Sequence, residues 1–246
     1  MSTLQDNLAR VEEGIQTACR QANRRREEVE LMAVSKTHPA TSLAELAALG
    51  QLLFGENRVQ EYAAKSLEIR DLRSSSRPAL RVHLIGHLQS NKAQRAVELF
   101  DGIDTVDSLR LAERLNDAAG KLGRQLPILL EVKLSHEESK AGLDPTAAET
   151  AQFLERLPDL THLRLEGLMT IAPFDVPEDE TRACFRQLRQ LRDRWAQAHP
   201  RLEFSVLSMG MSGDYALAIA EGATRVRVGT SLFGSRPYPA KAGEAL

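Results

Sequence analysis

Eight short apolar segments recur along the chain, and amphipathic helical segments separate them. The apolar segments have the length of strands and cover residues 30–36, 52–55, 82–86, 103–106, 127–134, 163–171, 204–207 and 226–228. Strands that alternate with helices indicate parallel βαβ units, and eight such units close naturally into a barrel. A doubly wound open sheet is the alternative, and it is disfavoured because no G-x-G-x-x-G follows the first strand. The pattern therefore predicts an α/β fold, a single (β/α)8 TIM barrel over residues 30–234.

An extra N-terminal helix is expected before the barrel, within residues 1–26. Its apolar residues recur at spacings of three and four and give one stripe: Leu4, Leu8, Val11, Ile15 and Cys19. The chain has 246 residues, the length of one α/β barrel, and no shift in composition divides it. We therefore expect a single domain over residues 1–246.

Two helix starts inside the barrel are predicted from capping residues. Ser42 is followed three residues later by Glu45, which is the spacing of a capping box. Ser212 precedes a helical segment that Gly222 closes. The sequence therefore predicts helices that begin at these two serines.

The charge balance disfavours two classes of partner. The chain carries 32 basic and 34 acidic residues, so its net charge of −2 gives no broad attraction for nucleic acid or an anionic membrane. No stretch approaches the ~18 apolar residues of a transmembrane helix, and the N-terminus lacks the apolar core of a signal peptide. Cys19 and Cys184 match no metal or disulfide spacing. We expect a cytoplasmic protein and, with no added domain, a monomer.

Lys36 ends the first apolar segment, just before Pro39. Alternate residues of a strand share a face, so Lys36 is expected to point with Met32 and Val34 into apolar surroundings. Desolvation favours the neutral amine, a nucleophile that can form a Schiff base with an aldehyde. The alternative is an amine that extends from the strand end into water.

Two loops rich in glycine and serine follow the last two strands, where a barrel places phosphate sites. The first loop covers residues 208–214, and the second contains Gly229, Thr230 and Ser231. Glycines allow close approach of the backbone to a ligand, and serines offer hydroxyl groups. The two loops together predict a phosphate-binding site.

Arg227 alternates with Val226 and Val228 in the eighth strand, so it is expected to face the barrel interior near its top. A guanidinium stays charged there and needs an acceptor. A carboxylate such as that of Glu131 is one candidate, and a bound ligand is the other. A further group of arginines, on the helix near 180–198, is interpreted as a solvated surface or a docking face: Arg182, Arg186, Arg189 and Arg192.

Six groups of residues occur in an order that matches one known family. They read AVSKT at 33–37, FGEN at 54–57, HLIG at 83–86 with LQSNK at 88–92, EGLM at 166–169, LSMGMS at 207–212 and RVGTSLFG at 227–234. In these groups the chain resembles the pyridoxal 5′-phosphate (PLP) homeostasis proteins, also called the YggS family. The likeness runs from the first strand to the eighth.

This resemblance implies a barrel of the alanine racemase N-terminal type with PLP as its cofactor. It implies that Lys36 holds PLP as a Schiff base. It also implies further cofactor-binding residues: for the phosphate Ser212, Gly229 and Thr230, with backbone contacts from Gly210 and Met211, and for the ring Asn57, Ser208 and Arg227, the last at the pyridine nitrogen.

The implied function is homeostasis of PLP (vitamin B6), by a protein that holds PLP reversibly, with PLP-requiring apo-enzymes as expected recipients. The alternative is a PLP-dependent amino-acid racemase. Turnover is not expected, because a charged Arg227 at the ring nitrogen weakens the ring as an electron sink. No motif places a second base opposite Lys36. A barrel that acts on sugar phosphates without a cofactor is the third hypothesis, and it shares only the phosphate loops.

Overall fold

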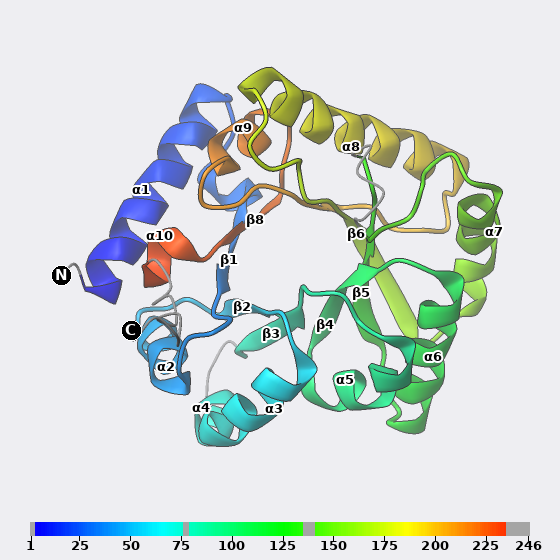
Figure 1. Cartoon of the computed structure of the whole chain (residues 1–246), viewed down its shortest axis with the longest axis horizontal. Helices are drawn as coiled ribbons and strands as arrows, with labels where there is room; N and C mark the ends of the chain where they lie inside the picture. The colour runs from blue at the N-terminus through cyan, green and yellow to red at the C-terminus, as the bar shows by residue number, and fades with distance from the viewer. Residues whose placement is uncertain (1–2, 76–78, 135–140, 235–246) are drawn as a thin grey trace, which may run out of the picture.

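The strands form one closed barrel in the computed structural model, which describes residues 3–75, 79–134 and 141–234 (Figure 1). Each strand pairs in parallel with its neighbours in the sequence, and β8 pairs with β1. The strands are β1 (Glu30–Val34), β2 (Leu53–Glu56), β3 (Arg81–Leu84), β4 (Gly102–Val106), β5 (Leu126–Glu131), β6 (Leu163–Met169), β7 (Val206–Ser208) and β8 (Arg225–Val228). The prediction of a (β/α)8 barrel is confirmed.

Helices cover the outside of the barrel and connect successive strands (Figure 1). They are α1 (Leu4–Gln21), α2 (Ala40–Ala48), α3 (Val59–Glu68), α4 (Arg70–Ser75), α5 (Ala93–Leu99), α6 (Leu109–Lys121), α7 (Ala148–Arg156), α8 (Glu178–Ala198), α9 (Tyr215–Ala220) and α10 (Thr230–Phe233). Short 3-10 turns add Arg26–Glu28, Ser90–Lys92 and Leu157–Asp159. None of the helices in the described ranges combines the length and the apolar character that crossing a bilayer requires.

The predicted extra helix is α1, which packs beside α9 and α10 (Figure 1). Its apolar stripe is buried at Val11, Ile15 and Cys19. The amide of Asn7 donates a hydrogen bond of 2.7 Å to the carbonyl of Leu232, at the end of the barrel that follows β8. The helix therefore braces the segment that follows the last strand.

Charged side chains fill the barrel interior near the N-terminal ends of the strands. Arg225, at the start of β8, contacts Glu30 at 2.9 Å and Asp104 at 3.3 Å. Nδ1 of His83 lies 2.8 Å from the other oxygen of Asp104. The guanidinium of Arg225 and the ring of His83 together lower the pKa of Asp104, against the effect of burial. Ionic contacts thus occupy this end, and open space lies at the other.

Several element boundaries differ from the sequence prediction, and three of the differences involve residues discussed above. β1 ends at Val34, so Lys36 lies beyond the strand rather than within it. α2 begins at Ala40 after Pro39 and not at Ser42, because proline presets an extended residue before a helix. α9 begins at Tyr215 after Asp214 and not at Ser212, whose hydroxyl is used elsewhere.

Candidate functional site

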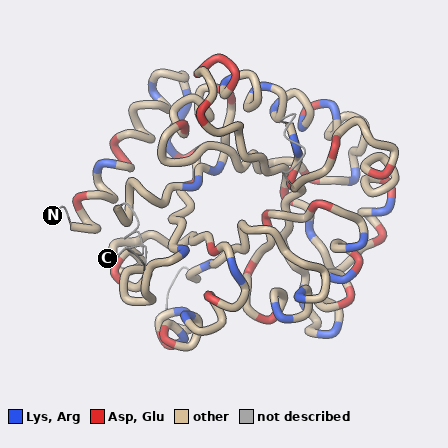
Figure 2. The backbone as a smooth tube through the Cα atoms, viewed as in Figure 1, with Lys and Arg blue, Asp and Glu red and all other residues tan. Residues whose placement is uncertain are grey.

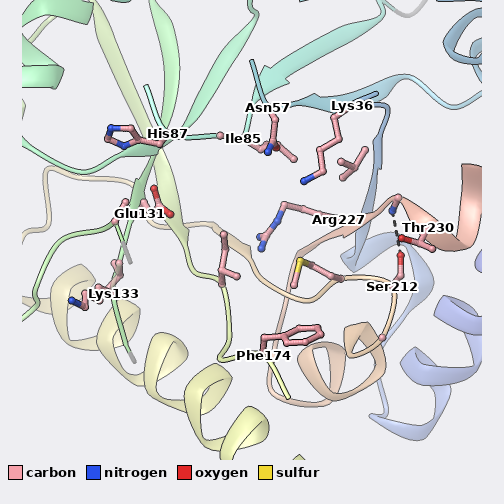
Figure 3. Close-up of a pocket in the computed structure, with 18 of the residues that line it drawn as sticks. Lys36, Asn57, Ile85, His87, Glu131, Lys133, Phe174, Ser212, Arg227 and Thr230 are labelled. Carbon is pink, nitrogen blue, oxygen red and sulfur yellow. Dashed lines mark hydrogen bonds between the residues drawn. The ribbon is translucent and has the colours of Figure 1, made fainter. Parts of the chain in front are cut away.

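A cavity of about 670 Å³ opens at the C-terminal ends of the strands. Lys36 follows β1, Asn57 follows β2, Glu131 ends β5 and Arg227 lies on β8, and all four line it (Figure 3). Barrels of this kind carry their sites at this end. The volume falls in the range of small-molecule pockets, roughly 300–1,000 Å³. The cavity is therefore the candidate functional site.

Lys36 lies in the turn that directly follows β1. Its side chain is half-buried, and Figure 3 shows the amine pointing into the cavity, toward Arg227. The next residue, Thr37, has a φ of 67°, a left-handed conformation that is strained for a β-branched side chain. The amine is thus directed inward by a constrained turn rather than by the pleat of a strand.

A buried network of hydrogen bonds and ion pairs anchors the residues on both sides of this turn. The ammonium of Lys65, on α3, donates to the carbonyl of Ser35 at 2.9 Å and to Oε1 of Glu56 at 2.6 Å. The hydroxyl of Ser35 donates to the same carboxylate oxygen at 2.7 Å. Oε1 of Glu61 accepts from the backbone N–H of Thr37 at 2.5 Å. Burial raises the pKa of Glu56, and its contact with Lys65 opposes that rise. The residues on both sides of Lys36 are therefore anchored.

Arg227 is buried and held by three hydrogen bonds. Its two terminal nitrogens donate to Oγ of Ser208 and to the carbonyl of Thr170, both at 2.9 Å. Its backbone N–H donates to the carbonyl of Gly210 at 2.9 Å. In the described ranges it forms no ion pair with Glu131, the partner that the sequence had left open. Burial lowers the pKa of the guanidinium, yet arginine is basic enough to remain a charged donor.

The loops after β7 and β8 meet at Ser212. Its Oγ accepts from the backbone N–H of Gly229 at 3.3 Å and from that of Ser231 at 3.4 Å. Both hydrogen bonds are long and therefore weak. Gly210 is needed nearby, because its φ is 91° and an added Cβ would lie 2.6 Å from that of Ala218. The N–H groups of Gly229 and Ser231 thus converge on the hydroxyl of Ser212, which lines the cavity together with Thr230.

Glu131 places a buried carboxyl group on the opposite wall of the cavity. The residue is only 8% exposed, and its Oε2 has no hydrogen-bond partner among the described residues. Burial, and next the carboxylate of Asp107, raise the pKa of Glu131 to about 7. Asp107 itself lies 3.5 Å from Nδ1 of His87. The cavity therefore contains a carboxyl group that can change its protonation near neutral pH.

Comparisons with known proteins place this geometry in a family. The family profile described as "Alanine racemase, N-terminal domain" matches residues 7–237. A pyridoxal phosphate homeostasis protein of Pasteurella multocida is 40% identical over 237 residues, which cover 96% of this chain and 99% of that protein. The chain belongs to the pyridoxal phosphate homeostasis protein family. The resemblance of its sequence groups is thereby confirmed.

Solved structures of the same shape include one from this family and one more distant. The structure of PipY from Synechococcus elongatus PCC7942 with PLP bound has 48% sequence identity and a TM-score of 0.79, and the match covers 89% of this chain and 100% of that chain. Alanine racemase of Clostridium difficile 630 is 18% identical with a TM-score of 0.71, and the match covers 96% of this chain but 58% of the racemase. The second likeness concerns the fold alone.

In this member of the pyridoxal phosphate homeostasis protein family, most of the predicted site residues share one cavity. Those that line it are Lys36, Asn57, Met211, Ser212, Arg227, Gly229 and Thr230. Ser208 and Gly210 do not line it, and instead accept hydrogen bonds from Arg227.

The sequence interpretation overlooked the network under Lys36. A usable signal was present, because Lys65 shares the buried face of α3 with Val59 and Tyr62 at three-residue spacing. A lysine on an apolar helix face indicates a buried ionic partner. Glu131 was considered only as a partner of Arg227, and no pattern in the sequence indicated that one of its oxygens is unpaired.

Proposed function

We propose that this chain is a PLP-binding protein of vitamin B6 homeostasis, which holds PLP covalently through Lys36. The observation that carries the proposal is the amine of Lys36 directed into a cavity that also presents Arg227 and the two converging loops. The relatives named pyridoxal phosphate homeostasis proteins support it, as does PipY, whose structure is described with PLP bound.

The cavity offers a suitable group for each part of PLP, which has an aldehyde, a pyridine ring and a phosphate. The amine of Lys36 suits the aldehyde. Within the described part of the chain, the N–H groups of Gly229 and Ser231 have only the long hydrogen bonds to Ser212, so they are available to a stronger, anionic acceptor. The charged donor Arg227 suits the ring nitrogen, which is an acceptor when unprotonated. The residues present therefore fit the cofactor.

The remaining site residues have supporting roles in this proposal. Thr230 and Ser212 would add hydroxyl groups at the phosphate, with Gly210 and Met211 shaping the loop around it. Asn57 would lie beside the ring. Ser208 would act through Arg227, because its hydroxyl accepts from that guanidinium.

Holding the cofactor is favoured over turnover by the charge of Arg227. Bound PLP supplies an electron sink when its ring nitrogen is protonated. A guanidinium beside that nitrogen opposes its protonation and weakens the sink. Of the tyrosines in the described ranges, neither Tyr62 nor Tyr215 lines the cavity as a second base would. We therefore propose a binding role, with PLP-requiring apo-enzymes as recipients of the released cofactor.

Titration of the cofactor-free chain with PLP tests this proposal. We expect a new visible absorption band that neither component shows alone, since the Schiff base conjugates the amine nitrogen with the ring. Lys36→Ala should lose the band. Lys133→Ala is the matched control, because it removes another lysine that lines the same cavity, and it should keep the band.

Covalent mapping identifies the attachment point independently. Borohydride reduction of the loaded chain followed by peptide analysis should place the cofactor on the peptide that contains Lys36. Attachment at Lys133, or a colourless protein at saturating PLP, would contradict the proposal. In the second case a barrel that binds phosphate compounds without a cofactor becomes the better explanation.

A further inference from the structure

The carboxyl group of Glu131 lines the cavity but has no part in the proposed contacts with the cofactor. Glu131 is more than nine-tenths buried, and its Oε2 has no hydrogen-bond partner among the described residues. A buried carboxylate without donors is costly, because the group loses hydration and gains no replacement. Such a group on the wall of an open cavity indicates a site for a ligand that supplies a donor.

Glu131 lies across the barrel from the residues assigned to the cofactor. In a closed barrel with strands in sequence order, β5 is opposite β1. Lys36 follows β1, and the loops that gather at Ser212 follow β7 and β8, whereas Glu131 ends β5. Figure 3 shows the two groups on opposite sides, with Arg227 between them. The Glu131 side is therefore a separate part of the same cavity.

The cavity that Glu131 lines can also take a short apolar body. Ile171 and Phe174 line the cavity and are 40% and 89% exposed, so they offer apolar surface at its mouth. Arg227 acts on Glu131 through its charge but forms no hydrogen bond to it among the described residues, since its terminal nitrogens donate to Ser208 and Thr170. The amine of Lys133 points away from Glu131 in Figure 3. A cationic donor is the partner that a buried carboxylate binds best.

We propose that the Glu131 side of the cavity is a binding subsite for small primary alkylammonium compounds, with the ammonium on Glu131 and the alkyl group against Ile171 and Phe174. If the chain binds PLP, an amine could lie in the same cavity as the cofactor, and this consequence rests on the proposed function. Binding of the amine itself does not rest on that function. The two ideas can therefore fail separately.

The test is a ligand-observed NMR titration of the full cofactor-free chain with n-butylamine, with 1-butanol and butyrate as neutral and anionic analogues. At about pH 8 we expect butylamine to bind and Glu131→Gln to weaken it at least about tenfold, the loss typical of a charged hydrogen bond. Glu113→Gln is the matched control, because this exposed carboxylate lies on α6 outside the cavity. It should bind like the natural chain.

The pH dependence of butylamine binding is a second test, and it uses the natural chain with Glu131 in place. Alkylamines stay protonated below about pH 10, so affinity should rise from about pH 6 to about pH 8 as Glu131 ionises. The charged groups that face Glu131 are Asp107, His87 and Arg227. His87→Gln should retain the rise in affinity, which would assign the pH dependence to Glu131.

Three outcomes would overturn the subsite. They are equal affinity in Glu131→Gln, tighter binding of butyrate than of butylamine, and a pH dependence that disappears only in His87→Gln. A chain that binds butylamine but never PLP would retain the subsite and contradict the proposed function. A chain that binds PLP and no amine would do the reverse.

Discussion

Two lysines near the first strand illustrate how local partners decide what an amine can do. Lys65 is 5% exposed, and its ammonium contacts a carbonyl and two carboxylates, those of Glu56 and Glu61. Lys36 is half-buried and points into the cavity. The ammonium of Lys65 donates to acceptors inside the protein, whereas the amine of Lys36 is directed into the cavity, where a ligand can reach it. The first is therefore structural, and the second is the candidate nucleophile.

Replacement of Lys65 tests whether its network positions Lys36. Lys65→Met should lower the free energy of unfolding by about 3 kcal/mol, because Glu56 would be left buried without its cation. It should also weaken PLP binding, since the carbonyl of Ser35 loses the donor that fixes the turn. Urea unfolding and the PLP titration measure the two effects. The double variant Lys65→Met with Glu56→Gln should recover part of the stability while PLP binding stays weak, and full recovery of both would contradict a positioning role.

Glu131 should make the folded chain less stable as pH rises. Its pKa of about 7 in the folded chain lies above the usual 4.5, so the folded state binds more protons between these values. Stability therefore falls as pH rises through this window, by up to about 3 kcal/mol. Glu131→Gln should remove that loss and be more stable at about pH 8, but show no gain near pH 4.5. Thermal unfolding at the two pH values measures this, and an equal gain at both would contradict the assignment.

Among the elements, the number and order of the strands could be predicted from the sequence, whereas the helix starts assigned to Ser42 and Ser212 were wrong. Strand number and order follow from apolar segments of the right length, which depend on local pattern alone. Ser212 has the right residue type for a helix cap, but its hydroxyl accepts from Gly229 and Ser231 on another loop. The site shows the same limit. Arg227 could be placed from the alternation of its strand, but the amine of Lys36 is directed by a turn after β1 that the sequence interpretation had read as strand. The unpaired oxygen of Glu131 depends on contacts between distant segments.

The difference between a real cap and an apparent one can be measured. Thr3 caps α1, since its hydroxyl accepts from the N–H of Asp6 and its own N–H donates to that carboxylate, both at 3.1 Å. Thr3→Ala should therefore cost about 1 kcal/mol. Ser42 lies within α2 and provides no cap, so Ser42→Ala should change stability by less than about 0.5 kcal/mol. Chemical unfolding of the two variants makes the comparison, and a larger loss for Ser42→Ala would restore the helix start predicted from the sequence.

At the scale of the whole molecule, the two ends of the barrel divide stability from binding. The interior near the strand N-termini is filled by the contacts among Arg225, Glu30, Asp104 and His83. The other end is open, and its walls carry the amine, the loop donors and the free carboxyl group. Substitutions at the filled end should act on unfolding, whereas those at the open end should act mainly on ligands, with Glu131 as the residue that also affects stability. This division lets the site be altered without loss of the fold.

The closed barrel also bears on self-association. Closure pairs every described strand on both sides, so the described sheet offers no free edge to a second copy. Basic and acidic residues are interspersed along the outer helices in Figure 2. The exposed apolar side chains near the cavity are Ile171, Phe174 and Met211, a small group at the mouth.

We therefore predict a monomer, with a mass near 27.2 kDa by light scattering after size-exclusion chromatography over a wide range of concentrations. Phe174→Ser should leave the mass unchanged, because a few apolar side chains are far smaller than the roughly 1,200 Å² that a stable interface buries. A mass of twice this value would contradict the prediction. If Phe174→Ser then lowered the mass to that of one chain, the contact between the two copies would lie at the cavity mouth. PLP would then have to enter the cavity between the two copies. Loading with PLP should then depend on protein concentration, which a monomer excludes.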